Sequence, residues 1–232
     1  MSETPARLPR GARRNAPPGH VEREMMRLFR SRERNGVPQW DLPHLFVPLR
    51  WDGSRMSAGP AHQIEVTTRP NAYPDLLAGL ASDDAHEQAR LAREGEEPTL
   101  YGYMLLQEMY SVEHSPATAT PLEERRWKRD SAERRYHERP DARESCMVLA
   151  ADIDGRYWQA IRFRHTPKQV RRMFWQSVDS PCISKSREHR GARFPGGIST
   201  MTMMRIAKAL AMVLYGDQVR APADAEVVSL RG

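Results

Sequence analysis

An Asp-Gly pair between two apolar, β-prone segments is the feature that most constrains the fold of this chain. The segments are residues 146–153 and 157–163, and the pair is Asp154-Gly155. Two-residue turns between strands favour Asp-Gly because both turn positions adopt φ > 0. The sequence therefore predicts an antiparallel hairpin at 146–163 as the centre of the fold.

A second strong pattern follows near the C-terminus, where apolar residues recur at helical spacing. Residues 199–215 place Met203, Ile206, Leu210 and Leu214 on one face, and Gly216 marks the end of the helix. The chain is 39% hydrophobic, which is enough for a core. We therefore expect an α+β fold, in which an antiparallel sheet with the central hairpin packs against a C-terminal helix.

Other segments extend this fold with less distinct patterns. Strand-like stretches cover 45–51, 62–68 and 100–112, although the length of the last does not exclude a helix. Residues 168–178 are a candidate third strand beside the hairpin, and residues 71–93 and 122–139 have helical patterns. Pro48 places the strand at 45–51 at a sheet edge or in a loop, because proline cannot donate a ladder hydrogen bond.

Composition along the chain predicts four regions. Residues 1–19 are rich in proline and arginine and are expected to form a disordered basic arm. An amphipathic helix at 20–36 is followed by a single α+β domain at 40–216 and by a flexible tail at 217–232. Within the domain, residues 179–197 carry proline and glycine and are expected to form a loop.

Charge is distributed very unevenly. Residues 155–193 contain ten Lys and Arg against two acidic residues, whereas 60–115 contain three basic residues against ten acidic ones. A basic block of this kind attracts phosphates or an acidic protein surface. The alternative is a solvated face that the acidic segment neutralises within the same chain.

The second arm of the hairpin supplies the candidate site. Alternation along the strand places Arg156, Trp158, Arg162 and Arg164 on one face, and strands use such an arrangement to stack bases and hold phosphates. The predicted nucleic-acid contacts continue through the following strand and loop: Lys168, Arg171, Arg172, Lys185, Arg187, Arg190 and Arg193. The alternative is that Trp158 packs under the terminal helix and the arginines only flank it.

Signatures of enzymes and metal sites are not found in the sequence. It contains no P-loop, no G-x-S-x-G, no H-E-x-x-H and no dinucleotide glycine pattern, so no catalytic residue, metal site or cofactor is predicted. The two cysteines, Cys146 and Cys182, are too few for a disulfide framework. No apolar run is long enough to span a membrane, and a cytoplasmic location is expected.

From Tyr110-Ser-Val-Glu113 through Arg139-Pro-Asp-Ala-Arg-Glu144 to Ala151-Asp-Ile-Asp-Gly-Arg-Tyr157, the chain resembles small uncharacterised proteins of high-GC actinobacteria and their phages. In those proteins a charged helix that ends in Arg-Pro-Asp precedes a hairpin with an Asp-Gly-type turn. The resemblance implies an origin in a phage or mobile element, and it brings no activity or site residue with it.

These observations favour a non-enzymatic nucleic-acid-associated accessory or regulatory protein. It would bind phosphate through the hairpin face and the loop that follows. The first alternative is a protein-binding adaptor that modulates a host or phage DNA enzyme and uses the acidic segment at 60–115 as its interface. An enzyme of unrecognised type is the third possibility. The oligomeric state is not predicted.

Overall fold

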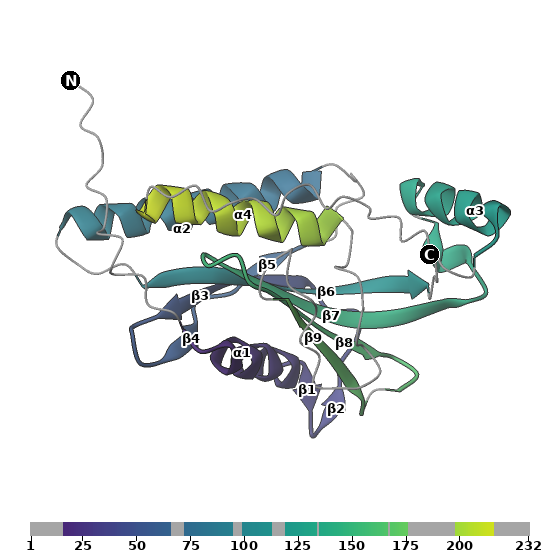
Figure 1. Ribbon diagram of the computed structural model, residues 1–232. Coiled ribbons are helices and arrows are strands. Elements are labelled where there is room, and N and C mark those ends of the chain that lie inside the picture. Colours follow the sequence, from purple (N-terminus) through teal and green to yellow (C-terminus); the bar gives the residue numbers. More distant parts are fainter. Residues whose placement is uncertain are drawn as a thin grey trace, which may run out of the picture.

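The computed structural model describes residues 16–65, 72–94, 99–112, 119–133, 135–166, 168–175 and 198–215. Its centre is a seven-stranded antiparallel sheet in the order β4-β3-β6-β7-β8-β9, with β5 also paired to β3 (Figure 1). The strands are β1 (Glu33–Arg34), β2 (Val37–Pro38), β3 (His44–Trp51), β4 (Met56–Ala58), β5 (His62–Ile64), β6 (Leu100–Val112), β7 (Ala142–Asp152), β8 (Tyr157–Phe163) and β9 (Val170–Trp175). The helices are α1 (Pro18–Arg30), α2 (Ala72–Arg93), α3 (Pro121–Ala132), the 3-10 turn η2 (Tyr136–Glu138) and α4 (Ile198–Tyr215). The predicted α+β class, with a central hairpin and a C-terminal helix on the sheet, is confirmed.

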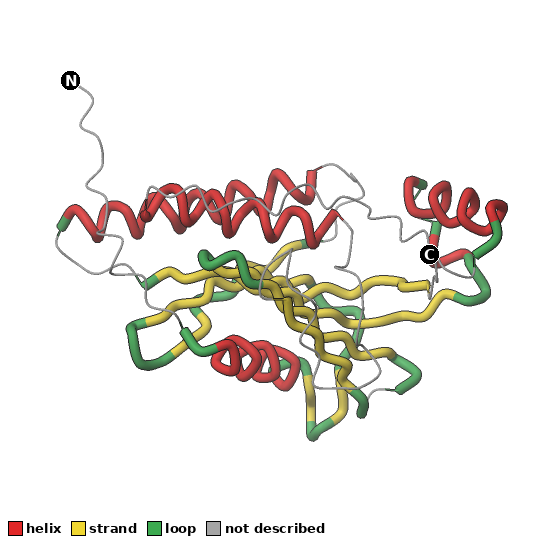
Figure 2. Tube along the Cα trace, viewed as in Figure 1, coloured by secondary structure: helices red, strands yellow, loops and turns green. Residues whose placement is uncertain are grey.

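Helices cover the sheet on both sides (Figure 2). Helices α2 and α4 lie against one face, where the hydroxyl of Tyr103 on β6 donates to the carbonyl of Ala81 on α2. Helix α1 lies against the other face and contacts β7 and β4. All seven residues of β8 are consequently buried. The prediction that one face of this strand is accessible to phosphate is therefore wrong, because α1 covers that face.

The β7–β8 hairpin forms where the Asp-Gly pair predicts it, with Ala151 opposite Tyr157. Of the pair, only Gly155 adopts a positive φ, 74°, so the expected positive φ at Asp154 is wrong. The backbone N–H of Asp152 donates to the carbonyl of Arg156, which closes a loop of three residues, 153–155. The Asp152 carboxylate accepts hydrogen bonds from the backbone N–H groups of Asp154 and Arg156. A turn that ends in a left-handed glycine is a common three-residue hairpin connection.

The N-terminal helix is shorter than predicted. It spans Pro18–Arg30 instead of 20–36, and its side chains Val21, Met25 and Phe29 belong to the same hydrophobic core as the sheet. Beyond it, Asn35 and Gly36 adopt φ of 54° and 75° and connect β1 to β2. Asn-Gly is a strong signal for this two-residue hairpin turn. The β1–β2 hairpin therefore occupies residues that were predicted to belong to the helix.

Strand β3 is an interior strand, which corrects the prediction from Pro48. It pairs with β6 on one side and with β4 and β5 on the other. Pro48 lies between the segment that pairs with β5 and the segment that pairs with β4, and its carbonyl accepts from Gly59 on that same side. The missing N–H therefore faces the gap between the two short strands, where the ladder needs no donor.

The remaining elements follow the predicted pattern with adjusted limits. The strand at 100–112 and the helix at 72–93 are present, and β9 lies inside the predicted 168–178. The predicted helix at 122–139 is wrong in length, since α3 ends at Ala132 and η2 follows. The loop at 179–197, residues 1–15 and the tail at 217–232 lie outside the described residues. None of the helices in the described ranges is long and apolar enough to cross a membrane.

Candidate nucleic-acid interface

Arg156, the first residue of the predicted phosphate-binding face, is enclosed in a polar network at the closed end of the hairpin. Its Nε donates to the Asp152 carboxylate at 2.7 Å, and its two terminal nitrogens donate to the carbonyl of Ala16 at 2.7 Å and the hydroxyl of Tyr101 at 2.6 Å. That hydroxyl donates to Asp154 and accepts the backbone N–H of Ala16. Arg156 therefore ties the start of α1 to the hairpin.

A shift of pairing along the β3–β6 ladder places Tyr101 in this network. Leu49 of β3 pairs with Gly102, but the next residue, Arg50, pairs with Leu100, so Tyr101 is the extra residue of a β-bulge. Bulges redirect a side chain relative to the regular alternation. Gly102 beside it is required by space, since an added Cβ would lie 2.4 Å from the carbonyl oxygen of Ala151.

Burial controls the ionisation of the network. The Asp152 side chain is fully buried, and its removal from water raises the pKa of that carboxyl to about 7, against the opposing effect of Arg156. Burial likewise raises the pKa of the Tyr101 hydroxyl, so this group stays protonated. Burial by itself lowers the pKa of Arg156, but Asp152 and the other groups around it outweigh that effect and raise the pKa, so the guanidinium keeps its charge. The network is thus a buried, compensated structure without a free positive charge.

Trp158 and Arg162 are also buried on the α1 side. Trp158 is 1% exposed, so its ring offers no surface on which a base could stack. Arg162 is 6% exposed, donates to Glu33 at 2.6 Å and stacks over the ring of Phe29 on α1 at 5.0 Å. The predicted roles as stacking platform and phosphate contact are not compatible with this packing. The alternative that Trp158 packs in the core is therefore correct, but Trp158 packs on the α1 side of the sheet and not under the terminal helix α4.

Arg164 is the partly exposed member of the predicted hairpin face. It donates to Glu144 at 2.7 Å and to Asp41 at 3.2 Å, and its guanidinium stacks over Trp40 at 5.4 Å. The hydrogen bond to Glu144 is the main reason why the pKa of Arg164 is raised. Its charge is therefore balanced by two carboxylates before any ligand arrives.

Three carboxylates gather beside Arg164, namely those of Asp41, Glu108 and Glu144, with ligand atoms within 4.8 Å of one another. Glu108 accepts the backbone N–H groups of Asp41 and Leu42. Arg164 is bound to the other two, so one guanidinium is shared by three carboxylates and the cluster holds more acidic than basic groups.

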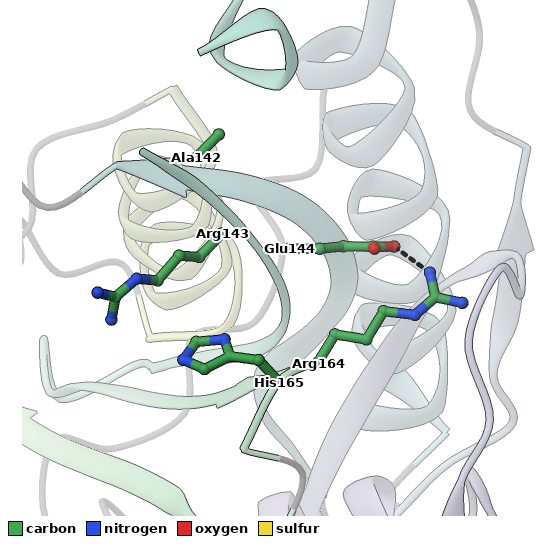
Figure 3. Close-up of a pocket in the computed structure, with 5 residues that line it drawn as sticks. All are labelled: Ala142, Arg143, Glu144, Arg164 and His165. Carbon is green, nitrogen blue, oxygen red and sulfur yellow. Dashed lines mark hydrogen bonds and ion pairs between the residues drawn. The ribbon is translucent and has the colours of Figure 1, made fainter. Parts of the chain in front are cut away.

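An open cavity of about 500 Å³ lies at the open end of the hairpin (Figure 3). Arg143, Glu144, Arg164 and His165 line it. Glu144 and Arg164 pair with each other on one side of the β7 strand, while Arg143 and His165 project on the other. The cavity combines positive and negative groups and does not form a uniformly basic surface.

The rest of the predicted contacts divide into two groups. Lys168 and Arg172 are exposed, and Arg172 lies opposite Ala160 of β8, on the α1 side of the sheet. The side chain of Arg171 and the whole of the predicted loop contacts lie outside the described residues: Lys185, Arg187, Arg190 and Arg193.

The ion pairs of the hairpin also decide how its charge is balanced. Arg156, Arg162 and Arg164 pair with acidic residues at positions 33, 41, 144, 152 and 154. No ion pair in the described part of the chain joins these three arginines to the acidic segment at 60–115. These three arginines are thus neutralised within the chain, but by acidic residues outside the segment at 60–115 that was predicted to do so.

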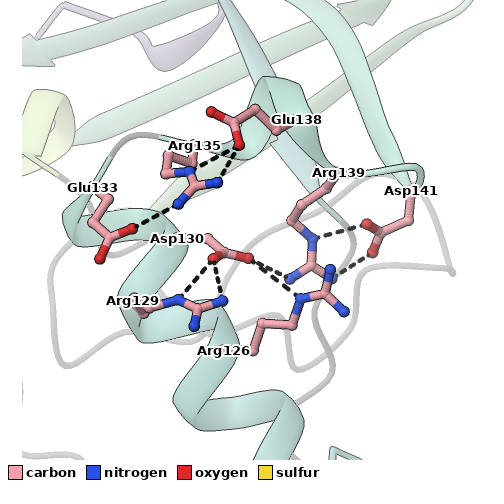
Figure 4. A network of polar contacts seen from close by, with 8 residues as sticks. All are labelled: Arg126, Arg129, Asp130, Glu133, Arg135, Glu138, Arg139 and Asp141. Atoms are coloured by element: carbon pink, nitrogen blue, oxygen red, sulfur yellow. Dashed lines mark hydrogen bonds and ion pairs between the residues drawn. The ribbon is translucent and has the colours of Figure 1, made fainter.

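A second basic region, at α3, is neutralised as well (Figure 4). The buried carboxylate of Asp130 forms ion pairs with three arginines, at nitrogen–oxygen distances of 3.8 Å to Arg126, 3.4 Å to Arg129 and 3.2 Å to Arg139. Arg139 also pairs with Asp141 at 2.8 Å, which lowers the pKa of that carboxyl. This network links α3 to the start of β7 and leaves little uncompensated charge around Asp130.

Positive charge that is not fully paired lies on the exposed face of α1, whereas the hairpin arginines are paired. Arg23, Arg27 and Arg30, here called the α1 arginine row, follow one another at four- and three-residue spacing and are exposed. Residues at such spacing are neighbours on a helix surface. Arg27 pairs with Glu24, but Arg23, Arg30 and the nearby exposed Arg34 have no ion-pair partner among the described residues.

The signal for this row was already visible in the sequence. The apolar residues of α1 occupy one stripe and the arginines the opposite one, and a helix with such a stripe buries it and exposes the other face. From the sequence alone, these arginines are compatible with contact to a nucleic-acid backbone or with a merely exposed amphipathic helix, and the basic block at 155–193 has the larger net charge. Net charge does not show which side chains are paired. Comparisons with protein-family models, with curated proteins and with solved structures find no match to this chain.

Proposed function

We propose that this protein is a non-enzymatic nucleic-acid-associated accessory or regulatory protein that binds phosphate through the α1 arginine row. The observation that carries the proposal is that three exposed arginines without an ion-pair partner among the described residues lie close together in sequence, on α1 and just after it: Arg23, Arg30 and Arg34. Arginine suits phosphate because its planar guanidinium donates in a fork that matches phosphate oxygens. Arg172 adds an exposed positive charge on the same side of the sheet.

The hairpin arginines support the same surface in a different role. Arg156 holds Ala16 just before α1, and Arg162 holds Glu33 just after it. Both ends of the helix are therefore fixed to the β7–β8 hairpin. These two arginines position the α1 arginine row and do not contact phosphate themselves.

The sequence before α1 strengthens the electrostatic argument. Residues 1–15 contain four arginines and one acidic residue, and they are joined directly to Ala16. Whatever their conformation, these charges are covalently close to the start of α1. Phosphate contacts are additive in their effect on salt dependence, so this segment would add to the affinity that the row provides.

Fluorescence anisotropy with a short labelled DNA duplex, measured across a series of salt concentrations, tests the proposal. Each neutralised phosphate contributes about 0.9 to the slope of log K against log salt. The double variant Arg23→Gln/Arg30→Gln should therefore lower the magnitude of the slope by about 1.8. The matched control is Arg125→Gln/Arg205→Gln, which removes two exposed arginines from α3 and α4.

The control should retain the wild-type slope, because α3 and α4 lie away from the α1 side of the sheet (Figure 1). Equal losses in the two double variants would show that only total charge matters and would contradict a site on α1. An absence of binding at low salt would reject nucleic-acid binding and would favour the alternative, a protein partner.

A further inference from the structure

Among the side chains that the structure describes, the α1 side of the molecule has positive charge without an accessible aromatic ring. The aromatic side chains next to α1 are buried: Phe29 is fully enclosed, Trp51 packs edge-on against His20, and Trp158 lies under the helix layer. Trp40 is half-buried and its ring is covered by the guanidinium of Arg164. Proteins that hold single strands without sequence preference combine a basic groove with aromatic rings on which bases stack. The described side chains of this surface offer the charge alone.

Elsewhere in the described chain, one large aromatic side chain is clearly exposed. Tyr110 is 44% exposed near the far end of β6, where its ring lies 6.0 Å from that of His137 on η2. It therefore belongs to the α3 end of the molecule and not to the α1 arginine row. Within the described ranges, a base bound by the row would find no exposed ring there to replace the stacking that it loses.

A surface of charge alone distinguishes nucleic acids by the density of their phosphates. A duplex carries about one negative charge per 1.7 Å of its axis and binds its counterions more strongly than a single strand does. Arg23 and Arg30 are seven residues apart, which is about 10 Å along a helix. A row of this length faces several phosphates of a duplex and releases more counterions than it would from a single strand.

The rigidity of the row acts in the same direction. The helix is fixed at its start by the Arg156 bond to Ala16 and at its end by the Arg162 bond to Glu33, and its apolar face is part of the core. A fixed row cannot adapt to a flexible strand, so the strand must be ordered at an entropic cost. A duplex already presents its phosphates in a regular arrangement and avoids most of that cost.

We infer that the α1 arginine row takes duplex nucleic acid as its ligand in preference to single strands, an inference that rests on the proposed function. Recognition is through the double-helical phosphate backbone. The bases contribute little, and the preference is independent of their sequence. Duplex DNA and duplex RNA share the chemistry that this surface recognises.

Anisotropy titrations of the full chain with four labelled probes test the inference: one DNA duplex, each of its separated strands, and an RNA duplex of the same sequence. At equal salt we expect at least about fivefold tighter binding to duplex than to either single strand, in keeping with the higher charge density. The slope of log K against log salt should also be steeper for the duplex. The DNA and RNA duplexes together identify which form is bound.

Variants separate this inference from the proposed function. Arg23→Gln/Arg30→Gln should reduce or abolish the preference for duplex, whereas Arg125→Gln/Arg205→Gln should preserve it. Single strands bound as tightly as duplex, with loss in the α1 variant, would overturn the duplex preference and leave nucleic-acid binding in place. An absence of binding to all four probes at low salt would overturn both. Circular dichroism and thermal unfolding of each variant confirm that these exposed substitutions leave the fold intact.

Discussion

Replacement of Arg156 by methionine provides the sharpest test of the buried network, because the effect should depend on pH. Methionine keeps the length of the aliphatic stem but removes the guanidinium, which donates to Asp152, Tyr101 and Ala16. Removal of one partner of a buried ion pair costs about 3–5 kcal/mol. Asp152 keeps two backbone N–H donors, so we expect a loss at the low end, about 3 kcal/mol.

The sign of the pH dependence follows from the Asp152 pKa of about 7 in the folded protein. At pH 5 this carboxyl is already protonated in the wild type, so the variant loses hydrogen bonds to Asp152 but no ion pair with it. At pH 8 the wild type has an ionised pair, whereas the variant must keep a buried, unpaired carboxyl protonated. The loss of stability should therefore be clearly larger at pH 8 than at pH 5.

Urea unfolding followed by circular dichroism at the two pH values measures both losses. A loss of about 3 kcal/mol corresponds to a fall in Tm of about 6–12 °C for a chain of this size. Arg164→Met is the control: its two ion pairs are at the surface and should contribute about 0–1 kcal/mol. A loss below 1 kcal/mol for Arg156→Met, or equal losses at the two pH values, would refute the reasoning from burial.

Three further changes test other parts of the account. Asp152→Asn should remove a decline in the wild-type free energy of unfolding between about pH 4 and pH 7, because the unfolded carboxyl, with a pKa of 3.8, loses its proton well before the folded one. Denaturant unfolding of both proteins across that range checks this prediction, and an unchanged decline in the variant would count against it. Gly102→Ala should destabilise the sheet by more than about 2 kcal/mol, since its Cβ would meet the carbonyl of Ala151; unfolding at wild-type urea concentrations would contradict the close approach. Cys146 is buried and its pKa is raised to about 12, so it should resist alkylation at pH 8 until the protein unfolds, as mass spectrometry of labelled peptides would show; rapid labelling of the native thiol would disprove its burial.

Local sequence patterns predicted most of the elements of this fold. The Asp154-Gly155 pair located the β7–β8 hairpin, and the apolar spacing of residues 199–215 located α4, because both signals act within a short stretch of chain. The same kind of signal at Asn35-Gly36 marks the β1–β2 turn, and its recognition would have ended α1 at the correct place. The prediction that Pro48 places its strand at a sheet edge or in a loop is wrong, because the proline is accommodated where β4 and β5 divide one side of β3 between them.

The candidate site was less predictable because burial of a strand face depends on a distant segment. Alternation along β8 correctly placed Arg156, Trp158 and Arg162 on one side, but it could not show that α1 covers that side. Their partners, Ala16 and Glu33, lie more than a hundred residues away in the sequence. An arginine in a strand has the same local pattern whether it binds a ligand or holds a helix.

Arginine footprinting tests the central claim most directly. Phenylglyoxal modifies accessible guanidinium groups, and mass spectrometry can compare each arginine in the free protein and in its complex with duplex DNA. The account predicts that Arg23 and Arg30 react in the free protein and are protected in the complex, that Arg125 and Arg205 react equally in both, and that Arg156 is unreactive throughout. Protection of Arg125 and Arg205 without protection of the α1 arginines, or ready modification of Arg156 in the folded protein, would contradict it.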